Sequence, residues 1–147
     1  MSQRVEKAVE AFTPEKCNCS QAVALAFADE AGFDEATAMN AARGFGGGIG
    51  RHGLTCGAVT GAVMVLGALA TRSASSEKEA KDKAYDMVHQ FTDRFTKQHG
   101  ALACKDLIGL DLSTEAGRQL NADMQVSRKL CPGFVRAAAE IVEDLSH

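Results

Sequence analysis

The stretch from Arg43 to Thr71, RGFGGGIGRHGLTCGAVTGAVMVLGALAT, contains the two features that decide how this chain folds. Its first part is a glycine loop, with six glycines from position 44 to position 53. Its second part, from about residue 55 to residue 71, consists of small and apolar side chains and is almost free of charge. This composition predicts a buried helix, preceded by a loop whose backbone can take conformations that other residues avoid.

The glycine loop does not predict a nucleotide site, although Gly48, Gly50 and Gly53 spell G-x-G-x-x-G. That motif binds a dinucleotide where it follows a strand of a parallel sheet, and here a helix is expected before the glycines. The neighbouring run 54–70 is at the short limit for a membrane span and is diluted by threonines. Its G-x-x-x-G pair, Gly57 and Gly61, instead predicts a close helix crossing.

The whole composition favours helix, with 25 alanines, only two prolines and no tryptophan. Capping signals at Asn18, Thr55 and Ser76 and a helix-opening position at Pro132 mark helix starts. Periodic segments cover 2–12, 19–31, 35–44, 55–71, 76–98 and 132 onward, with shorter ones at 101–108 and 113–126. We therefore predict an all-α fold: one domain, 1–147, forming a bundle of about six or seven helices around a buried glycine- and alanine-rich central helix at about 55–71.

The charge balance limits the classes of partner. With 16 basic and 19 acidic residues the chain has a net charge of −3 and no basic stripe, so nucleic acid and membrane surfaces are not expected partners. The N-terminal segment lacks the apolar region of a secretion signal, which predicts a cytoplasmic location. In that compartment the five cysteines are expected to serve redox, metal or catalytic chemistry rather than structural disulfides.

The cysteines share a local setting. Cys19, Cys56 and Cys131 each stand at the start of a predicted helix, where free N–H groups and the helix dipole stabilise a thiolate. Cys104 is followed by a lysine, which acts in the same direction, whereas Cys17 lies too early for its helix start. Cys56 is expected to be the most acidic thiol, because it begins the longest apolar helix and because Arg51 and His52, close to it in sequence, can add positive charge.

The spacing of the cysteines leaves several chemistries open. There is no C-x-x-C motif, so neither a thioredoxin-type site nor a zinc ribbon is supported. Four separated cysteines can still converge in space as ligands of an iron–sulfur cluster, or form redox disulfides in any of three pairings. The glycine loop can wrap around a small cofactor or can simply join two closely packed helices. Its candidate cofactor-binding residues are Gly46, Gly47, Gly48, Gly50 and His52.

The order of these features resembles a known family. The segments NCSQAVALAF (18–27) and GFGGGIGRHGLTCGAVTGAVMVLG (44–67), a single Cys104 after FTKQHG, and Cys131 near the end are similar to the redox-active proteins called C_GCAxxG_C_C. The resemblance implies four recurring cysteines, Cys19, Cys56, Cys104 and Cys131, with Cys17 outside the pattern. It also implies redox activity, and related segments occur in cytochromes that carry an iron–sulfur centre.

We therefore expect a small redox protein in which Cys19, Cys56, Cys104 and Cys131 converge around the glycine loop as catalytic thiols or as metal ligands. They would either cycle between thiol and disulfide or hold a [2Fe–2S]-like cluster for electron transfer. The expected partner is a redox protein or a small oxidant or disulfide, and a homo-oligomer stays open. The alternatives are a non-catalytic module that binds zinc and a helical interaction module without chemistry.

Overall fold

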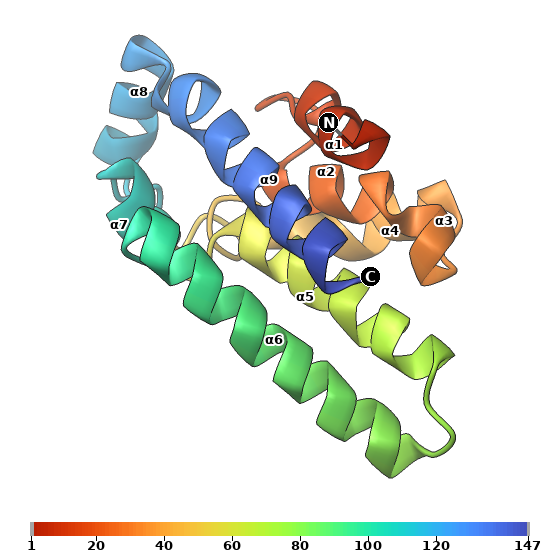
Figure 1. Ribbon diagram of the computed structural model, residues 1–147. Helices are drawn as coiled ribbons and strands as arrows, with labels where there is room; N and C mark the ends of the chain where they lie inside the picture. Colours follow the sequence, from red (N-terminus) through yellow and green to blue (C-terminus); the bar gives the residue numbers. More distant parts are fainter. Residues whose placement is uncertain (1, 147) are drawn as a thin grey trace.

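The computed structural model describes residues 2–146, and the regular structure in this part of the chain is helical (Figure 1). In chain order the elements are α1 (Gln3–Ala11), α2 (Cys19–Ala26), α3 (Ala28–Ala31), α4 (Glu35–Ala42), the 3-10 turn η1 (Arg43–Phe45), α5 (Gly57–Arg72), α6 (Glu77–His99), α7 (Cys104–Ile108), α8 (Glu115–Met124) and α9 (Val126–Leu145). The all-α, single-domain prediction is confirmed. The described part holds more helices than the expected six or seven, because the predicted segment 19–31 divides at Phe27 and the short segments are helical too.

Local capping explains most helix starts. The Asn18 side chain accepts a hydrogen bond from the Gln21 backbone N–H, and the Gln21 side chain accepts one from Asn18, which closes a reciprocal capping box. Ser76 caps α6 by accepting from the N–H of Glu79 at 3.1 Å. The expectation of a Thr55 cap was wrong by one residue, because Cys56 is the N-cap of α5 and its side chain makes no capping hydrogen bond.

The last helix does not open at Pro132. It begins at Val126, so Pro132 lies inside α9, where its ring removes one hydrogen-bond donor from the helix. The preceding residue, Gln125, takes φ +52° and ends α8, and the chain turns at once into α9. The Asn121 side chain accepts from the N–H of Ser127 at 2.8 Å and so satisfies a free donor of the first turn. This cap comes from the neighbouring helix.

The main packing contacts of the bundle are made by α2, α5, α6 and α9. Helices α5 and α6 form an antiparallel pair, α9 packs against both, and α2 packs on α5, with α1 joining α2 and α9 (Figure 1). The core contains the fully buried side chains Phe27, Leu66, Phe91, Phe95, Val135 and Val142. The starts of α2 and α5, the short α7 and the first half of α9 meet at one end of the molecule (Figure 1). No helix within residues 2–146 is long and apolar enough to cross a membrane.

Candidate functional site

The start of α2 is anchored from two directions. Cys19 is its first residue, directly after the Asn18 cap. The Asn18 amide also donates to the carbonyl oxygen of Arg43 at 3.0 Å, which ties the start of α2 to the start of the glycine loop. Gln21 is only 3% exposed and donates from Nε2 to the carbonyl oxygen of Met39 in α4. Cys19 is therefore held on a backbone that has little freedom to move.

The G-x-x-x-G pair of α5 brings that helix against α2. A Cβ atom added to Gly61 would lie 2.6 Å from the carbonyl oxygen of Ser20, and one added to Gly57 would lie 2.9 Å from the backbone nitrogen of Ser20. The same Cβ at Gly57 would lie 3.1 Å from the Cβ of Cys19. Only glycine permits this approach, and it places Cys56, the N-cap of α5, beside Cys19.

A short antiparallel bridge between Thr55 and Ala103 brings the backbones of the next residues, Cys56 and Cys104, together. The backbone N–H of Cys56 donates to the carbonyl oxygen of Leu102 at 2.8 Å, and the N–H of Cys104 donates to that of Leu54 at 2.5 Å. The glycine loop packs on the same place, since a Cβ added to Gly48 would lie 2.7 Å from the Cβ of Cys104. Two cysteines that are far apart in sequence are thus fixed side by side by backbone contacts.

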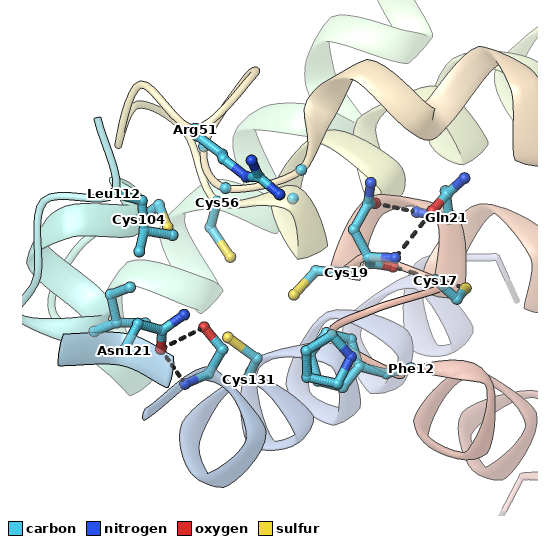
Figure 2. A pocket seen from close by; sticks show the side chains of 18 of the residues that line it. Phe12, Cys17, Cys19, Gln21, Arg51, Cys56, Cys104, Leu112, Asn121 and Cys131 are labelled. Atoms are coloured by element: carbon cyan, nitrogen blue, oxygen red, sulfur yellow. Dashed lines mark hydrogen bonds between the residues drawn. The ribbon is translucent and has the colours of Figure 1, made fainter. Parts of the chain in front are cut away.

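Cys131 comes from the interior of α9 rather than from its start. It is buried, and an interaction between its thiol and that of Cys19 lowers the pKa of Cys131 and raises that of Cys19. Figure 2 shows the sulfur atoms of Cys19, Cys56 and Cys131 pointing into the same space. Cys104 is electrostatically coupled to Cys56 and Cys131, so these four residues form one group, here called the four-cysteine cluster. All of them are free thiols.

Cys17 lies outside this cluster. Its side chain is 7% exposed and stands on the far side of Cys19 from the other sulfurs (Figure 2). Burial is the one cause that raises the pKa of Cys17, and no other thiol contributes to it. The described cysteines therefore divide into four that interact and one that does not.

Burial and hydrogen bonding give the clustered thiols different acidities. Burial raises the pKa of Cys56 to about 11 and that of Cys104 to about 12. The pKa of Cys131 is lowered, first by the hydrogen bond from the Cys19 thiol and then, against the effect of burial, by the hydroxyl of Ser127. The pKa of Cys19 is raised, because a proton on Cys19 is what stabilises the Cys131 thiolate.

The expectation that Cys56 is the most acidic thiol was wrong. Its side chain is 4% exposed, and loss of hydration outweighs the stabilising N–H groups of Ala58 and Val59 at the start of α5. Cys131 has the lowered pKa although it is not at a helix start. Its acidity comes from a partner on another helix.

The cluster opens into a cavity of about 690 Å³. All five cysteines line it, as do Gly46, Gly47, Gly48 and Gly50 of the glycine loop. His52 does not line this cavity; it is exposed, and its Nδ1 lies 3.0 Å from the carbonyl oxygen of Ile49. The four glycines and the thiols therefore face a common space, whereas His52 stands apart from it.

Metal binding by the cysteines stays a prediction. Four thiolates suit a soft metal ion or an iron–sulfur cluster. Within residues 2–146, however, no three His, Cys, Asp or Glu side chains are arranged so that they could hold one metal ion.

Sequence reasoning missed the cationic side chains of the cavity. Lys16, Arg43 and Arg118 line it together with Arg51, which the sequence suggested only as a charge near Cys56. They come from the segment before α2, from η1, from the glycine loop and from α8, so no local pattern brings them together.

Comparisons with known proteins agree with the order of the cysteines. The family model described as "Putative redox-active protein (C_GCAxxG_C_C)" matches residues 17–145, which is most of the chain. No curated protein and no solved structure matches it.

Proposed function

The chain belongs to the C_GCAxxG_C_C family of redox-active proteins, and from this we propose that it carries out two-electron thiol–disulfide exchange at Cys131 and Cys19. The observation that supports the proposal is that the sulfurs of Cys19 and Cys131 point into one cavity (Figure 2), where their interaction lowers the pKa of Cys131 and raises that of Cys19. A nucleophilic thiolate with a protonated thiol beside it, both facing a cavity, is the arrangement that a dithiol reaction requires.

In the first step the Cys131 thiolate attacks one sulfur of a disulfide R–S–S–R′. A Cys131–S–S–R bond forms, and R′–S⁻ leaves with the electron pair and takes up a proton. Charge explains the order of attack, because the thiolate form is the nucleophile and Cys131 is the thiol whose pKa is lowered.

In the second step Cys19 resolves the mixed disulfide. The largest cause that raises the pKa of Cys19 is its hydrogen bond to Cys131, and this cause vanishes once the Cys131 sulfur carries no charge. Cys19 can then lose its proton, attack the Cys131 sulfur and release R–S⁻. The products are a Cys19–Cys131 disulfide and two reduced external thiols, so atoms and electrons balance. A reducing compartment such as the cytoplasm, with a redox partner protein or a small thiol, would restore the dithiol.

A thiolate-bound metal or an iron–sulfur cluster is the second candidate. It is favoured by one observation, that four thiols of one protein face a single cavity. Binding would require the cysteine side chains to move from the positions described above. Metal analysis and the visible spectrum of anaerobically purified protein separate the two candidates, since a brown protein with bound iron would favour the cluster.

Thiol counting after oxidation tests the dithiol reaction. Reduced wild-type protein treated with 2-hydroxyethyl disulfide should lose two thiols and yield a cross-linked peptide that contains Cys19 and Cys131. The Cys19→Ser variant should stop at a mixed disulfide on Cys131, and Cys131→Ser should lose the fast phase. Cys17→Ser is the matched control and should behave as wild type, because Cys17 takes no part in the cluster. A mixed disulfide that forms first on Cys56 or Cys104 would overturn the proposal.

A further inference from the structure

The cavity beside the thiols has a charge opposite to that of the whole protein. The chain carries a net charge of −3, yet the cavity lining has four cationic side chains, Lys16, Arg43, Arg51 and Arg118, and one carboxylate, Glu15. That carboxylate is paired with Arg128, which does not line this cavity. The positive charge around the thiols is therefore not neutralised from within the lining, and it will attract anions.

Arg51 is the cation best placed to meet a ligand. Arg43 donates from Nη1 to Asn40, and Arg118 donates from Nη1 to the carbonyl oxygen of Leu112. The guanidinium of Arg51, like the ammonium of Lys16, has no ion pair or hydrogen-bond partner among residues 2–146. In Figure 2 its side chain extends over the cavity, between Cys56 and Cys19. A planar guanidinium with all donors available suits a carboxylate, which it can bind through two parallel hydrogen bonds.

The backbone that presents Arg51 is strained. Five consecutive residues, Gly47 to Arg51, have positive φ, with values of 64°, 72°, 64°, 56° and 66°. Glycine takes this conformation readily, but arginine does so at a cost. A Cβ added to Gly47 would lie 2.8 Å from both the Cα and the Cγ of Arg51, so the loop is wound tightly against the stem of that side chain. A non-glycine residue whose backbone is held in an unfavourable conformation beside a cavity is typical of functional sites.

We propose that Arg51 binds the carboxylate of a small anionic disulfide and so holds its S–S bond at the four-cysteine cluster. This rests on the proposed thiol–disulfide exchange and names its substrate class. A cavity of about 690 Å³ has the size of a small-molecule site, which favours a low-molecular-weight disulfide over a disulfide within a folded protein. Arg51 acts as a binding residue in this proposal, while the thiols carry the electrons.

Three disulfides that differ chiefly in charge test the proposal. These are 3,3′-dithiodipropionate (anionic), 2-hydroxyethyl disulfide (neutral) and cystamine (cationic). The rate at which the protein reacts with each disulfide is divided by the rate at which dithiothreitol reacts with the same disulfide, which corrects for differences in intrinsic reactivity. At low salt the normalised rate with wild-type protein should be highest for the anion. Arg51→Gln should lower the anionic rate about five- to tenfold and leave the neutral rate unchanged, whereas Arg51→Lys should retain part of the preference. Arg72→Gln, which removes a positive charge far from the cavity lining, is the matched control.

A second measurement is independent of redox chemistry. Suberate has CH₂ groups in place of the two sulfurs of dithiodipropionate and cannot be reduced. Its titration into the reduced protein should shift the NMR signal of the Arg51 side chain, and Arg51→Gln should weaken binding. An equal loss of neutral and anionic rates in Arg51→Gln, or no suberate effect at Arg51, would overturn the inference and leave the proposed function standing. Absence of reaction with all three disulfides, together with suberate binding at Arg51, would overturn the proposed function alone.

Discussion

Replacement of Gly48 by alanine should destabilise the protein and displace Cys104. Gly48 has φ +72°, a conformation that costs alanine about 1 kcal/mol more than glycine. The added Cβ would lie 2.6 Å from the nitrogen of Leu54, 2.7 Å from the Cβ of Cys104 and 2.8 Å from the carbonyl carbon of Gly53. Two of these neighbours are backbone atoms that cannot turn away, and such overpacking costs about 1–3 kcal/mol. We expect the free energy of unfolding to fall by about 2–4 kcal/mol in total.

Two other glycines separate these contributions. Gly109 has φ +74° and nothing within 4 Å of an added Cβ, so Gly109→Ala measures the conformational cost alone. Gly44 has neither a positive φ nor a close neighbour, so Gly44→Ala should change stability little. Urea unfolding of the reduced proteins, followed by far-UV circular dichroism, gives the free energy of unfolding of all three variants. The dependence of that free energy on urea concentration checks two-state behaviour.

The comparison between these variants decides whether the packing argument holds. If Gly48→Ala loses no more stability than Gly109→Ala, the glycine loop can relax around a side chain and the argument from close packing fails. If stability falls as expected, alkylation of Cys104 in the folded Gly48→Ala variant should also become faster, because the loop then no longer covers that thiol closely.

Four further outcomes follow from the same structure. In α5, Gly61→Ala should lower the free energy of unfolding by about 1–3 kcal/mol, because its Cβ would lie 2.6 Å from a carbonyl oxygen of α2. Gly67 has open space around an added Cβ, so Gly67→Ala should raise the free energy of unfolding in urea by about 0.5–1 kcal/mol, since alanine favours a helix more than glycine does. Arg51→Gly should raise stability by about 1 kcal/mol by relieving φ +66°, while it lowers the normalised rate with dithiodipropionate. Iodoacetamide should label Cys131 at lower pH than Cys56, whose folded pKa is raised to about 11. The folded protein keeps the proton on Cys56 up to a higher pH than the unfolded chain does, so the free energy of unfolding should fall as pH rises from about 8.5 towards 11. The fall should be smaller in Cys56→Ala. A steeper fall in that variant would contradict the raised pKa of Cys56.

Helix positions were predictable wherever the deciding interactions are local. The cap at Asn18 and the cap at Ser76 each depend on a residue three positions later, so the sequence signal and the hydrogen bond coincide. Pro132 misled the prediction because its usual place is the first turn of a helix. Here α9 begins six residues earlier, at Val126, with a cap from Asn121 of the preceding helix, which no short pattern reveals.

The sequence by itself determined that the chain is helical, that Gly57 and Gly61 permit a close helix crossing, and that four cysteines recur in a family order. Only the tertiary structure decided which thiol is acidic and which cation faces the thiols. A pKa depends on loss of hydration and on hydrogen bonds from whatever surrounds the group, and for Cys131 the largest effect comes from Cys19, more than a hundred residues away along the chain. Helical periodicity relates residues that are three or four positions apart, so it does not reveal which residues of other helices surround a thiol.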